Sequence, residues 1–168
     1  MAIRNIVQEG DSILTKMCRP VTNFDERLGL LLDDMKETLA KANGAGLAGP
    51  QVGVLRRVFV MIEISEAEEE QEENAEPVYK FIEAVNPVIV GQEGVQTGYE
   101  GCLSFPGRAG EVTRPLKVTM RAQDRTGKEF TYTGEGINAR CICHECDHLD
   151  GVTILDRAEY FYEEEDEG

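Results

Sequence analysis

His144 and His148 are the only two histidines in this chain of 168 residues, and they stand four residues apart with Glu145 directly after the first. On a helix, residues at this spacing lie on one face, one turn apart, so both imidazoles can reach a single metal ion. Glu145 would lie beside them, where a carboxylate can take a proton from a metal-bound water. The pattern therefore favours a metal-dependent hydrolase over two histidines of the surface or core with no shared role.

Two histidines do not complete such a site, because a catalytic zinc-type centre takes three protein ligands and leaves one position open. Ile154 stands where the pattern HExxHxxGxxH needs a third histidine, and only a short charged segment follows Gly151 to supply a downstream glutamate. The remaining candidate is a cysteine thiolate. Glycines and prolines bend the chain around Cys102, which we therefore favour. Cys141 is the weaker alternative, because three ligands on adjacent turns of one helix have poor tetrahedral geometry.

Composition excludes several other classes of protein. The net charge is −15, from 32 acidic and 17 basic residues, which argues against binding nucleic acid or an anionic membrane. The longest apolar stretch, Val58 to Ile62, is too short to span a bilayer, and the N-terminal segment has no secretory signal pattern. The five cysteines are an odd number, which favours reduced thiols in a cytoplasm over disulfides.

A helix should precede the chemistry-bearing segments. Asn23 and Glu26 resemble a capping box that opens it. Apolar residues then recur at helical spacing and give one core-facing stripe: Leu28, Leu31, Leu32, Met35 and Leu39. We expect the helix to stop before Asn43 and Gly44, where a glycine-rich turn, GAGLAGPQVG, begins.

Strands should dominate the middle of the chain. Runs typical of strands cover Arg57 to Ile64 and Tyr79 to Val90, and Asn86-Pro87 must bend the second run or place it at a sheet edge. Alternating residues predict a hairpin, with strands at Leu116 to Gln123 and Glu129 to Thr133 and a turn at Asp124 to Gly127.

The histidine pair falls on a second predicted helix, Ile137 to Leu149, which Gly151 closes at the position that favours glycine. One helix before the strands and one after them predict an α+β fold. We expect a single catalytic domain over residues 1–157, in which mostly antiparallel strands surround the HExxH helix. An acidic insertion at about 65–77 and an acidic tail at 158–168 should be solvated segments.

Three segments resemble the motifs of the peptide deformylase family in order and spacing. The family patterns are GxGxAAPQ, EGCLS and QHExDHLxG. This chain has GAGLAGPQ at Gly44–Gln51, EGCLS at Glu100–Ser104 and CHECDHLDG at Cys143–Gly151. The similarity runs from the N-terminus to about Arg157. The chain departs from the family patterns at Gly49 and Cys143. It also lacks the family's common C-terminal helix, which is basic and contacts the ribosome in many bacterial members.

The resemblance implies a role for each matching position. Cys102, His144 and His148 would be the metal ligands and Glu145 the proton shuttle, in an attack of metal-bound hydroxide on the formyl carbon. The side-chain amide of Gln51 and the backbone N–H of Leu103 would hold the negative charge on the formyl oxygen. The residues implied to bind the formylmethionyl peptide are Gly44, Ala45, Gly46, Glu100, Ile137 and Cys141.

The resemblance also implies the remaining properties. The metal would be Fe²⁺ natively, with Zn²⁺ or Ni²⁺ in preparations, since nitrogen and sulfur donors suit all three. We expect a cytoplasmic monomer of bacterial type, with an organelle as the other location, and the acidic tail argues against docking on the ribosome. The alternative is a metallohydrolase of the same fold with another acyl or peptide specificity, because Ala45 replaces a larger residue of many relatives. A metal-stabilised binding domain without activity is the third hypothesis.

Overall fold

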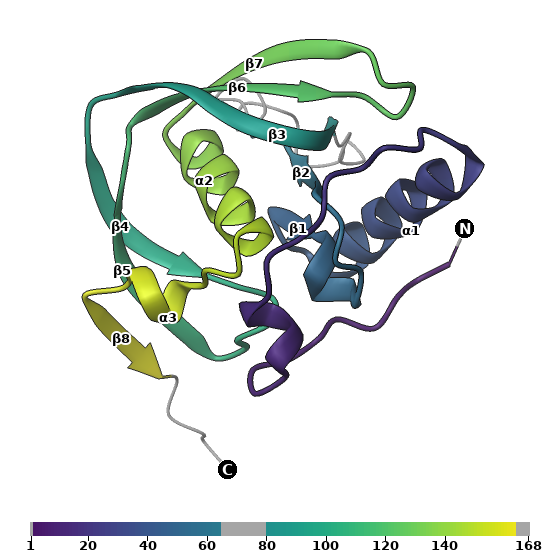
Figure 1. Cartoon of the computed structure of the whole chain (residues 1–168). Helices are drawn as coiled ribbons and strands as arrows, with labels where there is room; N and C mark the ends of the chain where they lie inside the picture. The colour runs from purple at the N-terminus through teal and green to yellow at the C-terminus, as the bar shows by residue number, and fades with distance from the viewer. Residues whose placement is uncertain (1, 65–79, 164–168) are drawn as a thin grey trace, which may run out of the picture.

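Two antiparallel sheets surround one helix in the computed structural model, which describes residues 2–64 and 80–163 (Figure 1). The larger sheet has the order β1-β2-β3-β6-β7, and the smaller has the order β4-β5-β8. The strands are β1 (Gly46–Ala48), β2 (Val58–Ile62), β3 (Phe81–Glu93), β4 (Gln96–Gly101), β5 (Arg108–Arg114), β6 (Lys117–Gln123), β7 (Glu129–Glu135) and β8 (Tyr160–Glu163). The helices are α1 (Glu26–Ala42), α2 (Ile137–Leu149) and α3 (Ile154–Arg157), with 3₁₀ turns η1 (Ser12–Thr15) and η2 (Gly49–Val52). The α+β prediction is confirmed.

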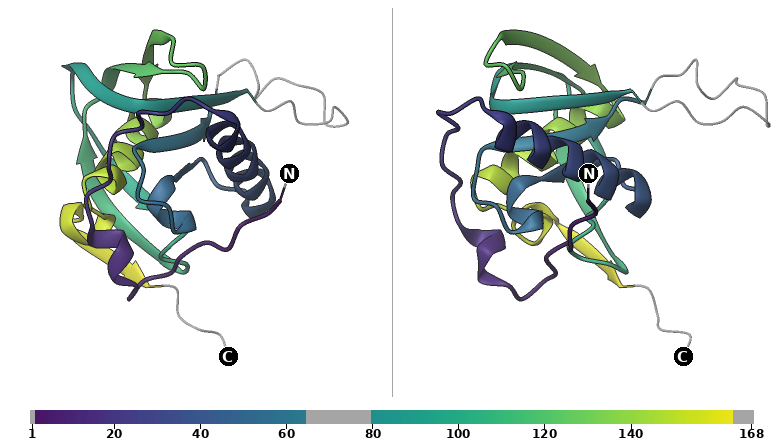
Figure 2. Two further views of the ribbon diagram at one scale, coloured as in Figure 1. Left: turned by 45° about the vertical axis from the view of Figure 1, so that its right-hand side comes forward. Right: turned by 90° about the vertical axis from the view of Figure 1, so that its right-hand side faces the viewer.

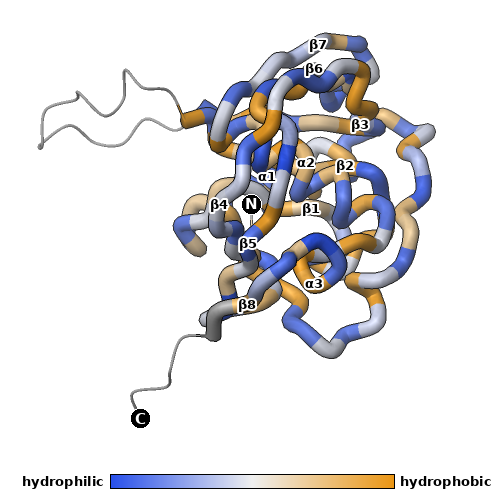
Figure 3. The backbone as a smooth tube through the Cα atoms, turned by 90° about the vertical axis from the view of Figure 1, so that its left-hand side faces the viewer, coloured by the Kyte–Doolittle hydropathy of each residue, from blue (hydrophilic) through white to orange (hydrophobic). Residues whose placement is uncertain are grey.

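Helix α2 occupies the centre and carries the histidine pair. Its observed bounds are those predicted from the sequence, and Gly151 follows with a positive φ of 74°. Its apolar face packs on the inner face of the larger sheet, in a core that includes Phe59, Met61, Met120 and Ile142. Figure 2 shows the sheets on either side of this helix, and Figure 3 shows a hydrophobic stretch at β1, in the interior of the molecule. The site is therefore built on a helix that is packed between the two sheets.

Helix α1 covers β1 and β2 from the other side. The five residues of the predicted stripe are all buried. The helix ends at Ala42, as predicted, and Asn43 directly after it adopts the left-handed conformation with φ 56°. The predicted start was wrong. Asp25, not Asn23, caps the helix, because its side chain accepts the backbone N–H of Leu28.

Strand β3 shows how the Asn86-Pro87 pair is accommodated. Asn86 has a φ of 51°, and the pairing register with β6 shifts between Val85 and Val88. The predicted bend is therefore confirmed. The edge alternative is wrong, because β3 lies between β2 and β6. Pro87 lies two residues beyond Val85, the last residue of β3 that pairs with β2, so its missing N–H costs no hydrogen bond to that strand.

Four strands were not predicted from the sequence: β1, β4, β5 and β8. β1, β4 and β5 each contain glycine, which weakens the strand signal. Part of the expected glycine-rich turn is thus strand β1, paired with β2 from Gly46 to Ala48. Strand β4 pairs with β5 over its whole length and ends directly before Cys102.

The fold continues beyond the predicted domain end at residue 157. Strand β8 pairs with β5, so residues 160–163, which the sequence predicts to be part of a solvated tail, instead complete the smaller sheet. After α2, the described residues contain only the four-residue α3 and this strand. The expected acidic insertion, at about 65–77, and residues 164–168 of the expected tail lie outside the described residues. Within the described ranges no helix is long and apolar enough to cross a membrane.

Candidate metal centre

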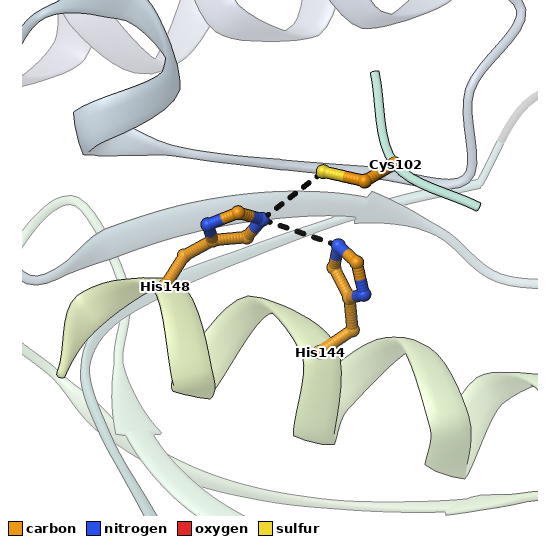
Figure 4. Close-up of side chains that lie close together, drawn as sticks. All are labelled: Cys102, His144 and His148. Atoms are coloured by element: carbon orange, nitrogen blue, oxygen red, sulfur yellow. Dashed lines mark hydrogen bonds between the residues drawn. The ribbon is translucent and has the colours of Figure 1, made fainter. Parts of the chain in front are cut away.

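Three potential ligand atoms converge between α2 and the turn that follows β4 (Figure 4). Nε2 of His148 lies 3.2 Å from Nε2 of His144 and 3.3 Å from Sγ of Cys102, and all three atoms lie within 4.8 Å of one another. Metal–ligand bonds of about 2.1 Å to nitrogen and about 2.3 Å to sulfur, at tetrahedral angles, place such donors about 3.3–3.6 Å apart. Both distances from Nε2 of His148 are close to these values and the third pair lies within 4.8 Å, so the three donors can converge on one divalent ion.

The alternative third ligand, Cys141, takes no part in this cluster. Among the described residues, the group that could hold a metal consists of Cys102 and the two histidines. Burial raises the pKa of the Cys141 thiol, which disfavours the thiolate that a metal requires. Cys141 instead lines the cavity beside the cluster, as expected for a wall residue.

Glu100 fixes the orientation of His144. One carboxylate oxygen accepts the Nδ1–H of His144 at 2.7 Å, so Nε2 of this ring keeps its lone pair toward the cluster. Two arginines hold the carboxylate: Arg114 by two hydrogen bonds of 3.1 and 2.7 Å, and Arg140 by one of 3.2 Å. Although burial opposes ionisation, these bonds lower the pKa of Glu100 to about 2. It is therefore a permanent anion in the interior.

This ion-pair network continues to the surface. Arg114 also donates to Asp147 at 2.7 Å, and Asp147 lies on α2 between the two histidines. Arg157 of α3 donates two hydrogen bonds of 3.2 Å to the same carboxylate. Strand β5 and helix α3 are thus tied to the helix that carries the proposed ligands.

Glu145 lies against the cavity with an incompletely bonded carboxylate. The side chain is 2% exposed, and its Oε1 is buried without a hydrogen-bond partner in the described structure. Burial raises the pKa of Glu145 to about 7. Strand β1 makes room for it at Gly46, where an added Cβ would lie 2.6 Å from Oε2 of Glu145 and 2.8 Å from Sγ of Cys141. A carboxylate in this state can both accept and deliver a proton.

Gln51 lies behind the cluster rather than on the cavity wall. It is 1% exposed, and its Nε2 is 3.5 Å from Sγ of Cys102 and 3.1 Å from Oγ of Ser104. Leu103 does line the cavity. Within residues 2–64 and 80–163, no hydrogen bond engages the Leu103 backbone N–H, so this donor is available to a ligand.

A cavity of about 420 Å³ opens beside the cluster. The structure brings together at its wall all six residues that the resemblance assigned to peptide binding: Gly44, Ala45, Gly46, Glu100, Ile137 and Cys141. His144, Glu145 and Cys102 line the same cavity, whereas Gln51 and His148 do not. The cavity therefore gives a bound molecule direct access to the cluster.

Sequence reasoning missed four residues around the site: Arg114, Arg140, Asp147 and Ser104. A carboxylate expected in an apolar pocket, as at Glu100, signals that cationic partners must be nearby. The sequence offers many arginines, however, and cannot select the two that β5 and α2 supply. Asp147 carried a better signal, since it lies between the histidines on the same helix.

Comparisons with known proteins agree with this geometry. The family model described as polypeptide deformylase matches residues 3–163, which includes strand β8. The peptide deformylase of Caldicellulosiruptor bescii is 49% identical over 166 residues, which cover 99% of this chain and 92% of that protein. The peptide deformylase of Acetivibrio thermocellus is 46% identical over 166 residues, with 99% and 89% covered. A crystal structure of a peptide deformylase from Legionella pneumophila has a TM-score of 0.81 at 42% identity, and the match covers 94% of this chain and 87% of that one.

Proposed function

The chain belongs to the polypeptide deformylase family, and from this premise we propose how its own residues carry out the reaction. It is a peptide deformylase, a hydrolase that removes the formyl group from the N-terminal formylmethionine of nascent polypeptides. One observation carries the assignment of residues. The sulfur and the two imidazole nitrogens converge on one point, beside the only cavity-lining carboxylate that lacks full hydrogen bonding in the described structure.

Cys102, His144 and His148 hold the divalent ion of this metal-dependent family. When bound there, the ion would act as a Lewis acid and lower the pKa of the water bound to it. We propose Fe²⁺ as the native metal, with Zn²⁺ or Ni²⁺ replacing it in purified preparations. One thiolate and two neutral imidazoles suit all three ions. The Glu100 carboxylate supports this role, because it keeps the proton of His144 on Nδ1.

Glu145 moves the proton. It takes a proton from the attacking water and delivers it to the amine that leaves when the formyl C–N bond breaks. The position of Glu145 supports this role. Its Oε1 has no hydrogen-bond partner in the described structure, and its carboxylate lies beside Gly46 at the cavity wall. A pKa of about 7 suits a group that must be both base and acid near neutral pH.

Negative charge that develops on the formyl oxygen needs donors in fixed positions. The backbone N–H of Leu103 and the side-chain amide of Gln51 are those donors in the proposal. Removing one donor of this kind typically lowers the rate by about 100- to 1,000-fold. Leu103 supports its role by lining the cavity, and Gln51 by its contact with the Cys102 sulfur.

The cavity receives the methionine side chain. Its wall combines aliphatic and sulfur-bearing residues, Ile137 and Cys141, with the small residues of the segment Gly44 to Gly46. This lining matches an unbranched thioether in size and polarity. The backbone of the same small residues binds the peptide. Ala45 contributes only a methyl group to the wall. We therefore expect the enzyme to accept peptides whose first side chain is larger than methionine, which a panel of formyl peptides can test.

A complete site within one chain supports a monomer as the active form. Every proposed ligand and wall residue comes from this single copy. We propose that the enzyme acts in the cytoplasm, where formylated nascent chains arise. We also propose that its acidic C-terminal segment does not dock on the ribosome. Sedimentation of the purified enzyme alone tests the monomer, and a dimer would contradict it. Sedimentation with ribosomes tests the absence of docking, and a stable complex would contradict that.

The decisive experiment compares formyl-Met-Ala-Ser with its acetylated analogue, using anaerobically purified enzyme loaded with Fe²⁺. The formyl peptide should be hydrolysed far faster. Glu145→Gln should abolish turnover and still bind one metal ion per chain, whereas Glu129→Gln, a change at a mostly exposed carboxylate, should retain full activity. Equal turnover of the two peptides would favour the alternative of another acyl specificity. No turnover of either peptide by the loaded enzyme would favour a binding domain.

A further inference from the structure

The hydroxyl of Ser104 has no role in the reaction as proposed so far. Ser104 is fully buried and lies in the turn after β4, two residues beyond Cys102. Its Oγ accepts a hydrogen bond of 3.1 Å from Nε2 of Gln51. A buried hydroxyl in contact with a proposed catalytic amide can determine where that amide points.

The orientation of the Gln51 amide follows from its three contacts. The backbone N–H of Ala48 can only donate, so the side-chain atom 2.9 Å away from it is the oxygen Oε1. The NH₂ group must therefore face the other side, where Ser104 and Cys102 lie. One N–H is directed to Oγ of Ser104 and the second to Sγ of Cys102, at 3.5 Å.

The main chain holds Ser104 and Gln51 at a fixed separation. The backbone N–H of Val7 donates to the carbonyl of Gln51 at 2.7 Å, and the backbone N–H of Glu9 donates to the carbonyl of Ser104 at 2.8 Å. Both carbonyls thus bind one short N-terminal segment. The position of the hydroxyl relative to the amide is consequently set before any substrate arrives.

We propose that Ser104 is a positioning residue for deformylation. Its hydroxyl takes one N–H of Gln51 and thereby directs the second N–H toward the cluster of Cys102, His144 and His148. The inference rests on the proposed role of Gln51 in holding the charged formyl oxygen. Without the hydroxyl, one buried N–H loses its acceptor, and rotation of the amide becomes the way to satisfy it. A donor that must reorient during the reaction stabilises the transition state less than a fixed one.

The test is a double-mutant cycle on the metal-loaded enzyme with formyl-Met-Ala-Ser, using Ser104→Ala, Gln51→Ala and the double variant. Ser104→Ala should lower kcat by about 10-fold with KM little changed, and Gln51→Ala by about 100-fold or more. The double variant should match Gln51→Ala alone, because the hydroxyl acts only through the amide. Ser104→Cys, which keeps a weaker acceptor, should lie between Ser104→Ala and the wild type.

A second readout does not depend on turnover. With Co²⁺ bound, the charge-transfer absorption from the Cys102 sulfur responds to the N–H that points at it. Ser104→Ala should shift this band in the same direction as Gln51→Ala. The control is Thr38→Val on α1, which removes another buried, hydrogen-bonded hydroxyl outside the cavity wall. It should lower stability and leave both kcat and the cobalt band unchanged.

Each outcome decides the inference. Multiplicative losses in the double variant, or a Ser104→Ala enzyme within twofold of wild type, would overturn the positioning role while leaving the proposed function intact. A cobalt band that moves in Gln51→Ala but not in Ser104→Ala would overturn it as well. An unchanged kcat in Gln51→Ala would refute the proposed role of Gln51 and with it this inference.

Discussion

Replacing Glu100 by glutamine tests how the site is held together. The carboxylate accepts four hydrogen bonds, two from Arg114, one from Arg140 and one from Nδ1 of His144. An amide keeps one acceptor oxygen and substitutes an NH₂ group for the other. In one orientation the NH₂ group faces His144 and Arg114, and in the other it faces Arg114 and Arg140. In either orientation, the NH₂ group of the glutamine faces two N–H donors and can accept a hydrogen bond from neither.

The expected magnitude follows from these contacts. In the first orientation Nδ1 of His144 loses its acceptor, so the proton can move to Nε2, the atom that the metal requires. In the second, Nδ1 keeps a neutral acceptor and the imidazole becomes less basic. Loss of such a partner typically weakens metal binding by about 10- to 100-fold, which is about 1.4–2.7 kcal/mol. Stability should fall by about 1–3 kcal/mol, because Arg114 keeps only Asp147 as a charged partner.

The assay is a Zn²⁺ competition titration against a chromophoric chelator at neutral pH, with circular dichroism to confirm folding. Glu129→Gln is the matched control, because its carboxylate is 65% exposed and pairs with Arg121 on the outer hairpin. The control should bind zinc like the wild type. Affinity within twofold of wild type in a folded Glu100→Gln protein would refute the reasoning, since the carboxylate would then have no influence on the ligand.

Two further predictions concern the cavity and the outer ion pairs. Gly46→Ala should lower kcat/KM by about 100-fold or more while the protein stays folded, because the new Cβ would lie 2.6 Å from the carboxylate of Glu145 and must displace it. For Glu83, burial acts to raise the pKa, but hydrogen bonds from Arg125 and Lys36 lower it overall. Its folded pKa is thus below the unfolded value, so its stabilisation is present above about pH 4.3 and is lost as pH falls through the folded pKa. The stability difference between wild type and Glu83→Gln, measured by urea unfolding, should therefore shrink below about pH 4.3.

Both predictions have internal controls. Gly29→Ala, on α1, would place its Cβ 3.5 Å from Nη1 of Arg125, an ordinary van der Waals distance, and should leave kcat/KM unchanged. A Gly46→Ala enzyme with wild-type activity would show that Glu145 moves freely, against its proposed fixed position. A wild-type advantage over Glu83→Gln that is constant from pH 7 to about pH 3 would show that the ion pairs do not stabilise the fold through the charge of Glu83.

The sequence predicted the elements whose signals are local. Helix α2 was placed correctly because the spacing of its histidines and the glycine that closes it lie close together in the sequence. The β6–β7 hairpin was found for the same reason, since alternation and a turn signal sit side by side. The start of α1 was missed because Asn23 and Asp25 are both good caps, and only the tertiary structure selects between them.

The strands that position Cys102 could not be predicted in the same way. Strand β4 gains its structure from pairing with β5, and glycines at positions 98 and 101 hide the strand pattern. The ligand itself was identified by the chemistry of its thiolate and by a motif, not by the fold. The same limit explains β8: its polar, aromatic sequence has no core signal, and its partner strand lies about fifty residues earlier.

Different interactions hold the two sides of the metal centre, ion pairs around His144 and backbone hydrogen bonds at Gln51 and Ser104. This difference determines which substitutions the enzyme can tolerate. On the α2 side, buried ions fix His144, and removing one partner leaves a charge without compensation in the interior. On the β4 side, backbone hydrogen bonds from residues 7 and 9 fix Gln51 and Ser104, and side-chain substitutions there leave those bonds in place. Changes to the ion network should therefore reduce metal affinity and stability together. Changes to Ser104 should reduce turnover while metal affinity is largely kept, so the two classes of variant can be separated by measuring metal binding and kcat on the same samples.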